Sequence, residues 1–107
     1  MLKGATITRK HTIAVRQPQH ISAEVMSMLL EYVQAALRHA KYEILPDDGT
    51  YYGEIPECKG AYANAVTLED CRDQLREVLE EWVLFRVHRR LPLPIIDGIE
   101  LAIKEVA

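Results

Sequence analysis

The sequence predicts an α+β fold in which a largely antiparallel sheet is covered by helices. Two long stretches carry apolar residues every three or four positions, which is the spacing of amphipathic helices. Short runs rich in Tyr, Ile and Val lie between and after them, and Pro, Gly and Asp-Gly turns separate these runs. Strands that are grouped together and set apart from helices indicate an α+β arrangement.

Residues 1–21 form a basic segment that we expect to be an arm or a strand. Residues 5–16 are rich in Thr, Ile and Val, and Pro18 ends the run. No acid precedes Glu24, and because the whole chain has a net charge of −3, the remainder carries about −7. The segment could contact nucleic acid, stay solvated or pair with an acidic surface of a second copy. Its cations are Lys3, Arg9, Lys10 and Arg16.

Residues 22–107 are expected to form a single domain that begins with a helix over residues 22–41. Ser22 is a favourable residue for the N-cap of this helix. We expect His39 at the boundary of its apolar face. That face consists of Val25, Met28, Leu29, Tyr32, Val33, Ala36, Leu37 and Ala40.

Three short strands are predicted next, over residues 41–45, 51–55 and 61–66. The first two flank an Asp-Gly turn, which is typical of a β-hairpin. Pro56 ends the second strand because proline cannot donate a hydrogen bond to a neighbouring strand. Gly53 within a strand indicates a bulge or a close approach of the backbone to another group.

A second, longer helix is predicted to begin at Thr67, where Thr67 and Asp70 have the spacing of a capping box. The prolines of residues 91–94 end it. Asp97 and Gly98 then allow a turn, and alternating residues from Ile99 onward predict a last, half-buried strand. The predicted buried stripe of the helix is Leu68, Cys71, Leu75, Val78, Leu79, Trp82, Val83 and Phe85.

Length and composition exclude several classes of protein. A chain of 107 residues with 49% hydrophobic residues is long and apolar enough to form one core, which argues against disorder. No apolar run approaches the ~20 residues of a membrane helix. The N-terminus lacks the shape of a signal peptide, so we expect a cytoplasmic protein.

No residue pattern points to a catalytic, metal or cofactor site. The chain has two cysteines and four scattered histidines, without the paired spacing of a zinc site. Cys71 lies on the apolar stripe and should be buried, whereas Cys58 lies in a turn and should be more exposed. We therefore expect a protein that is not an enzyme and has no cofactor. A weak nuclease that uses acids such as Asp47 and Glu54 is an open alternative.

The stretch YYGEIPECKGAYANAVTLEDC, followed by a long helix and LPLP, resembles the HicB-like antitoxin family. The resemblance covers about residues 32–103, and Lys59 and Ala65 depart from the usual pattern. It implies a partial RNase H-like β-β-β-α-β domain with an added N-terminal helix, in the short stand-alone form of the family. The matching residues are Tyr51 or Tyr52, Pro56, Gly60, Thr67, Leu68, Glu69, Trp82 and Pro92 or Pro94.

The resemblance also implies a function in protein binding. HicB-like proteins neutralise a small basic ribonuclease of the HicA type, and an acidic body would complement such a partner. We also expect a homo-oligomer, a dimer or a tetramer, because sheet edges and the N-terminal arm can pair between copies. A nucleic-acid-binding module that acts through the basic arm is a further alternative. The expected partner-binding residues are Asp47, Asp48, Tyr51, Tyr52, Glu54 and Glu57.

Overall fold

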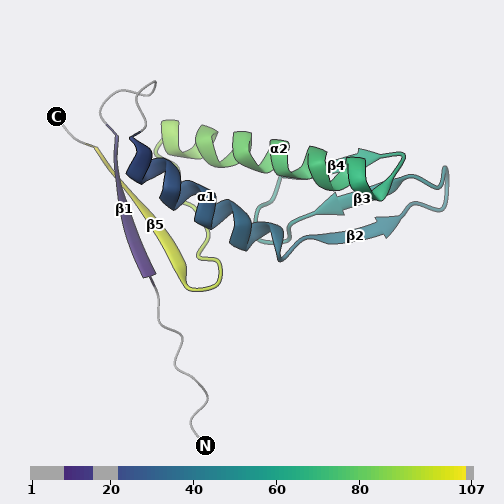
Figure 1. Ribbon diagram of the computed structural model, residues 1–107, viewed down its shortest axis with the longest axis horizontal. Coiled ribbons are helices and arrows are strands. Elements are labelled where there is room, and N and C mark those ends of the chain that lie inside the picture. The colour runs from purple at the N-terminus through teal and green to yellow at the C-terminus, as the bar shows by residue number, and fades with distance from the viewer. Residues whose placement is uncertain (1–8, 16–21, 106–107) are drawn as a thin grey trace, which may run out of the picture.

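The computed structural model describes residues 9–15 and 22–105 of the chain. Figure 1 shows the elements in order: β1 (Arg9–Val15), α1 (Ala23–Leu37), β2 (Lys41–Ile44), β3 (Tyr51–Glu54), β4 (Tyr62–Ala65), α2 (Leu68–His88) and β5 (Ile99–Glu105). This order of elements confirms the predicted α+β class, with a helix before three antiparallel strands and a second helix before the last strand.

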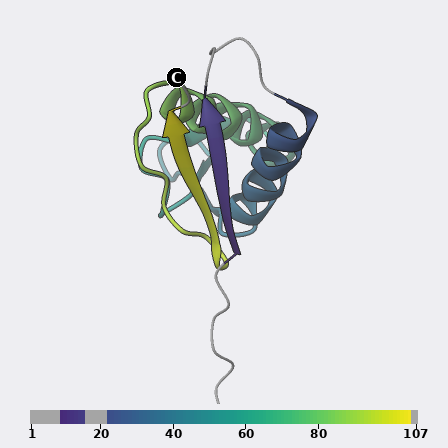
Figure 2. The same cartoon turned by 90° about the vertical axis from the view of Figure 1, so that its left-hand side faces the viewer.

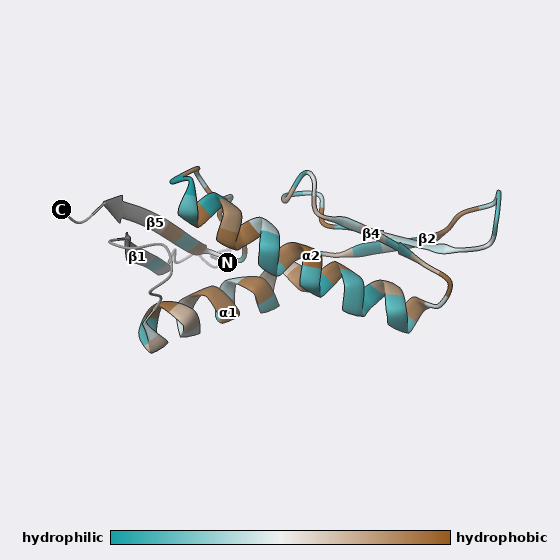
Figure 3. Cartoon of the chain, turned by 90° about the horizontal axis from the view of Figure 1, so that it is seen from above, coloured by the Kyte–Doolittle hydropathy of each residue, from teal (hydrophilic) through white to brown (hydrophobic). Residues whose placement is uncertain are grey.

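Strands β2, β3 and β4 form an antiparallel sheet in that order. The register places Glu54 opposite both Lys41 and Tyr62, and Tyr52 opposite both Glu43 and Asn64. Helix α2 packs against β3 and β4, and Figure 3 shows it lying along one face of the sheet. The sheet is therefore backed by a helix on one side.

Strand β5 pairs with β1 in a separate, parallel, two-stranded sheet, which the sequence interpretation had not anticipated. Figure 2 shows the two arrows side by side and pointing the same way. The cause lies in α2, because a helix of 21 residues is about 30 Å long and carries the chain away from the antiparallel sheet. The last strand thus starts beyond reach of β2, β3 and β4.

Helix α1 is shorter than expected, ending at Leu37 rather than near residue 41. Lys41 already pairs with Glu54 in the sheet, so the helix has to end before it. Its predicted start is confirmed, because the hydroxyl of Ser22 accepts a hydrogen bond from the Val25 amide at 3.2 Å.

Helix α2 has caps at both ends. The Thr67 hydroxyl accepts from the Asp70 amide at 3.1 Å, as the capping pattern predicts. At the other end, the Leu91 amide donates to the Arg86 carbonyl at 2.8 Å and the Arg90 amide to the Val87 carbonyl at 3.2 Å. This pair of bonds is a Schellman motif, with Arg90 in the left-handed region at φ 55°.

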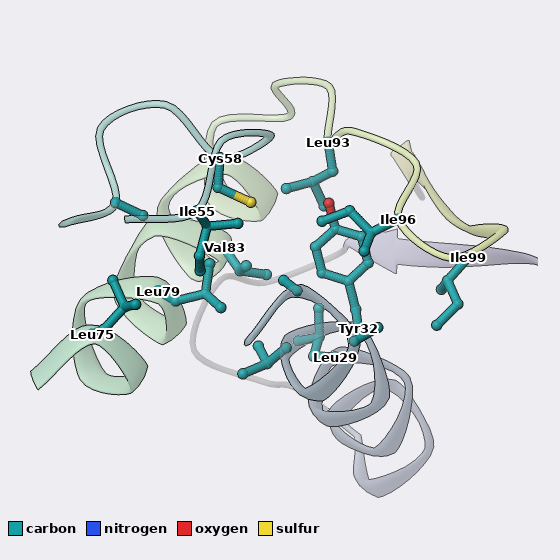
Figure 4. Packing of buried hydrophobic residues seen from close by; sticks show 14 of the residues in the cluster. Leu29, Tyr32, Ile55, Cys58, Leu75, Leu79, Val83, Leu93, Ile96 and Ile99 are labelled. Atoms are coloured by element: carbon teal, nitrogen blue, oxygen red, sulfur yellow. The ribbon is translucent and has the colours of Figure 1, made fainter. Parts of the chain in front are cut away.

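The core lies where α1, α2, the sheet and the segment before β5 meet (Figure 4). Tyr32 of α1 is fully buried, and its hydroxyl donates to the carbonyl of Pro94. Burial raises the pKa of the Tyr32 hydroxyl well above its usual value. The same cluster contains Leu79 and Val83 of α2, Ile96 of the segment before β5, and Ile99 of β5.

Burial differs from the sequence expectation at two residues. Cys71 is buried as predicted, but Cys58 is also fully buried, so its expected exposure is wrong. The Cys58 amide donates to the Ile55 carbonyl at 2.9 Å in a tight turn that faces the core. Phe85 was expected in the buried stripe of α2, yet 53% of it is exposed. It lies at the margin of that stripe, with the Arg89 guanidinium 5.1 Å from its ring centre.

Candidate functional site

The face of the antiparallel sheet that α2 does not cover is the candidate site. Successive residues of a strand point to opposite faces, so the register assigns each side chain to one face. Gly53, Ala63 and Ala65 are buried on the face that packs on α2. We call the opposite side the open face; it carries Lys41, Glu43, Tyr52, Glu54, Tyr62 and Asn64.

Gly53 explains how the sheet approaches the helix so closely. A Cβ atom at this position would lie 2.7 Å from the Tyr42 ring and 3.2 Å from the Cys71 sulfur. Only glycine leaves room for both groups, so the predicted close approach of the backbone is confirmed. Tyr52, Glu54, Tyr62 and Asn64 of β3 and β4 lie on the opposite face, away from α2.

Two tyrosines form the centre of the open face. The rings of Tyr52 and Tyr62 stack with centroids 6.1 Å apart and an interplanar angle of 29°. The Tyr52 hydroxyl donates to the Glu54 carboxylate at 3.0 Å. The pKa of Tyr52 is raised, first by burial and then by this hydrogen bond to Glu54. Tyr62 remains 58% exposed, so its ring is available for contact with another molecule.

Two hollows flank the tyrosine pair. One, of about 410 Å³, lies between Tyr52, Glu54, Tyr62 and the turn Pro56–Ala61. The other, of about 270 Å³, is lined by β2 and β3, including Lys41 and Glu43. Both are lined by Tyr52 and Glu54. The open face therefore presents an aromatic centre with a carboxylate and two shallow recesses beside it.

Trp82 holds the turn that forms one wall of the larger hollow. Its indole Nε1 donates to the Lys59 carbonyl at 3.0 Å and lies under Gly60. Gly60 has φ 99°, a conformation that glycine adopts without strain. Trp82 packs at the edge of the core, and the Arg86 guanidinium lies 4.9 Å from its ring centre. Trp82 thereby couples the position of the turn to helix α2.

His39 fixes the same turn from the other side. Its Nδ1 lies 2.6 Å from the Glu57 carboxylate and its Nε2 lies 2.6 Å from the Asp97 carboxylate. An imidazolium can donate through both nitrogens, so the charged form suits this arrangement. The hydrogen bonds to Asp97 and then Glu57 raise the pKa of His39, and the histidine lowers the pKa of both carboxyls. Arg38 adds an ion pair with Asp97 at 3.6 Å.

The structure distributes the six expected partner-binding residues over several places. Tyr52 and Glu54 lie on the open face, whereas Tyr51 packs against the core. Asp47 and Asp48 lie at the exposed tip of the β2–β3 hairpin. Glu57 is bound to His39. The sequence-predicted residues therefore do not form one cluster.

Asp48 also has a structural role at the hairpin tip. Its carboxylate accepts from the amide of Thr50 at 2.9 Å and from the hydroxyl at 2.7 Å. These hydrogen bonds lower its pKa. The Thr50 hydroxyl also accepts from the side-chain amide of Asn64 at 2.8 Å.

Among the expected nucleic-acid contacts, Lys3 and Arg16 lie outside the described residues. Arg9 and Lys10 begin β1, and the side chain of Lys10 is exposed. The sequence analysis did not identify Tyr62 and Glu43 as residues of the open face, and it did not predict the hydrogen bond between His39 and Asp97. The alternation of Tyr62 with the buried alanines of β4 could have indicated an outward tyrosine, but the partners of His39 depend on contacts between distant segments.

Neither a metal cluster nor a membrane helix is found in the part of the chain that the structure describes. Among the side chains that the structure describes within residues 9–15 and 22–105, no three of His, Cys, Asp or Glu converge so that they could hold a metal ion. Over those same ranges, no helix is both long and apolar enough to span a bilayer.

Cys58 lines the larger hollow, but burial and then the Glu57 charge raise its pKa to about 11. Its thiol is therefore protonated near neutral pH.

Comparisons with known proteins place the chain in a family. No protein with a curated description matches it. Among solved structures, the crystal structure of TTHA0281 from Thermus thermophilus is similar, with a TM-score of 0.60 and 38% sequence identity. That match covers 64% of this chain and 85% of the Thermus chain. The model of the UPF0150-like family matches residues 31–94, from α1 to the segment before β5, and the chain therefore belongs to the UPF0150-like family.

Proposed function

We propose that this protein is a HicB-like antitoxin-type binding protein that neutralises a small HicA-type ribonuclease through the open face of its sheet. Membership of the UPF0150-like family supports the domain type. The resemblance of residues 51–71 to HicB-like sequences supports the class of partner. The observation that carries the proposal is the stacked pair of half-buried Tyr52 and exposed Tyr62, with Glu54 beside it, on a face without a covering element among the described residues.

The chemistry of this face suits a protein partner. Exposed tyrosines provide rigid contact area that is enriched at protein interfaces. Glu43 and Glu54 add carboxylates, and the hairpin tip adds Asp47 and Asp48. A basic ribonuclease would be attracted by these acids and by the net charge of the chain. The shallow hollows beside Tyr52 can take side chains of the partner.

The proposed partner can be tested directly at the gene. The products of the reading frames on either side would be expressed alone and together with this protein. We expect one of them to be small and basic, to arrest growth when expressed alone, and to be neutralised by this chain. If neither neighbour arrests growth or forms a complex with the purified chain, the antitoxin proposal is contradicted.

Matched variants would then locate the binding surface. We expect Tyr62→Ala and Glu54→Gln to weaken the complex by about tenfold or more each in calorimetry, as interface anchors do. Asp73→Asn is the control, because Asp73 is an exposed acid of α2 and lies outside the open face. Equal losses for all three variants would indicate a general charge effect and would contradict the role of the open face.

The nuclease alternative has less geometric support. Asp47 and Asp48 lie at one end of the β2–β3 hairpin, Glu54 lies at the other end of β3, and Glu57 is held by His39. Incubation of the protein with RNA and Mg²⁺ or Mn²⁺ tests this reading. RNA cleavage that disappears in Asp47→Asn or Glu54→Gln would favour it over the binding proposal.

Nucleic-acid binding through the basic arm has a separate test. A gel shift should show salt-dependent binding that is lost when residues 1–20 are removed. Binding that persists in the truncated protein would exclude the arm as the contact.

A further inference from the structure

We propose that β1 pairs antiparallel with β1 of a second copy, around a two-fold axis at Thr12, so that two molecules share one four-stranded sheet in the order β5-β1-β1-β5. The inference concerns self-association and is independent of the proposed toxin. It starts from the ladder of β1 and β5, which is a separate sheet of two strands. It rests on the contacts, edges and sequence of that ladder.

The ladder is smaller than sheets that are stable in water. A two-stranded sheet is marginal in isolation, and parallel pairing is slightly weaker per residue than antiparallel pairing. Strand β5 is anchored, because Ile99 and Leu101 are buried in the core. Strand β1 packs extensively against β5 alone among the described elements. Its attachment would be strengthened by a strand on its other side.

The two edges of this ladder are protected differently. The segment 90–95 runs beside β5, and the two together line a hollow of about 360 Å³. Pro92 and Pro94 of this segment lack the backbone donors that a pairing strand would need. Nothing comparable lies against the outer edge of β1 among the residues that the structure describes. Figure 2 shows β5 on one side of β1 only.

Strand β1 itself has the features of a pairing edge. It extends over seven residues, from Arg9 to Val15, and the sequence RKHTIAV contains neither Pro nor Gly. The side chains of Lys10 and Thr12 are exposed. A long edge strand without proline or a bulge presents a row of backbone groups that can pair with another chain. The unprotected edge is therefore the outer edge of β1.

The sequence of β1 fits pairing with its own copy. An antiparallel pair centred on Thr12 places Arg9 opposite Val15 and Lys10 opposite Ala14. No two cations then face each other, and two threonines, a favourable cross-strand pair, meet at the centre. A two-fold contact of this kind uses the same patch on both molecules and closes at a dimer.

The first test compares two substitutions at the proposed axis, Thr12→Val and Thr12→Lys, with the unaltered full-length chain. Light scattering should give twice the monomer mass of 12.2 kDa for the unaltered protein and for Thr12→Val, which keeps a β-branched residue. Thr12→Lys places two cations opposite each other across the axis and should give monomer. Within one molecule Thr12 is paired with Ala102, which carries no charge. Thr12→Lys therefore places no like charge opposite in the ladder of β1 and β5.

A disulfide locates the contact independently. Thr12→Cys should form a covalent dimer under mild oxidation, whereas Lys10→Cys should not, because the two Lys10 positions lie about 13 Å apart in this register. The native Cys58 and Cys71 are buried and provide little background. A monomeric unaltered protein overturns the proposal. So does a dimer that survives Thr12→Lys and is not linked by Thr12→Cys.

Discussion

The two sheets of this protein leave different parts of themselves uncovered. The antiparallel sheet of β2, β3 and β4 is backed by α2 and leaves a face open, where side chains such as Tyr52 and Tyr62 are presented. The parallel ladder of β1 and β5 leaves an edge open, where backbone groups are presented. A face recognises a partner through its side chains, whereas an edge pairs with a strand through hydrogen bonds. One small chain can therefore offer two separate contact surfaces.

The largest effect should come from the core that supports the antiparallel sheet. Leu79 of α2 is fully buried beneath the region where the sheet and α1 meet. Leu79→Ala removes buried methyl groups and leaves a cavity, so we expect a loss of about 2–5 kcal/mol in the free energy of unfolding. Chemical denaturation measures this loss. A loss below about 1 kcal/mol would contradict the placement of Leu79 in a well-packed core.

A smaller effect should come from the contact between the sheet and α2. Gly53→Ala places a methyl group against the Tyr42 ring and the Cys71 sulfur, and we expect a loss of about 2–3 kcal/mol in the free energy of unfolding. Gly49→Ala is the control at the hairpin tip, where the added methyl meets no atom within 4 Å. There only the positive φ of 72° opposes alanine, at a cost of about 1 kcal/mol. Equal stabilities of the two variants would contradict the close approach at Gly53.

His39 connects the antiparallel sheet to the ladder of β1 and β5. Its hydrogen bonds to Glu57 and Asp97 join the end of α1 to the turn after β3 and to the turn before β5. Its raised pKa means that its contribution is complete below about pH 6.5 and is lost as pH rises through the folded-state pKa. The lowered pKa values of Glu57 and Asp97 mean that their contribution is lost on acidification below about pH 4.5. His39→Gln should therefore be most destabilising between about pH 4.5 and 6.5.

Thermal unfolding across about pH 3–9 would check this dependence. The difference in melting temperature between the unaltered protein and His39→Gln should narrow toward both ends of the range. A difference that is constant with pH would show that protonation of His39 does not contribute to stability.

The smallest effect on stability should come from the open face. Tyr62→Ala removes a side chain that is 58% exposed, so the free energy of unfolding should change by about 0.5 kcal/mol or less. Denaturation of this variant beside Leu79→Ala provides the contrast. A loss as large as that of Leu79→Ala would mean that Tyr62 supports the fold. Weaker binding of Tyr62→Ala would then reflect unfolding and would not support a role for Tyr62 in the interface.

The sequence predicts most of the fold and only part of the site. Local signals determined the caps at Ser22 and Thr67 and the turn at Asp97 and Gly98, because each depends on residues near in sequence. The pairing of β5 with β1 joins residues about 90 positions apart, and no local pattern specifies it. The burial of Cys58 likewise depends on how its turn packs on α2 and α1.

The candidate site shows the same limit. Alternation along β3 separates Tyr51 from Tyr52, so the sequence could place one tyrosine inside and the other outside. It could not show that Glu57 is held by His39, because that contact joins residues 18 positions apart. A cluster of acids in the sequence therefore became separate groups in space.

The most direct test of the open-face proposal is a titration of the labelled protein with its partner, followed by nuclear magnetic resonance. The inactive form of the neighbouring toxin would be added, and backbone amide shifts would be recorded for each residue. We predict that the largest changes fall on the strands that carry Lys41, Tyr52, Glu54 and Tyr62, with small changes on α1 and β1. Changes concentrated instead on α1, or on the apolar groove between Met26, Leu30 and Leu84, would contradict the account.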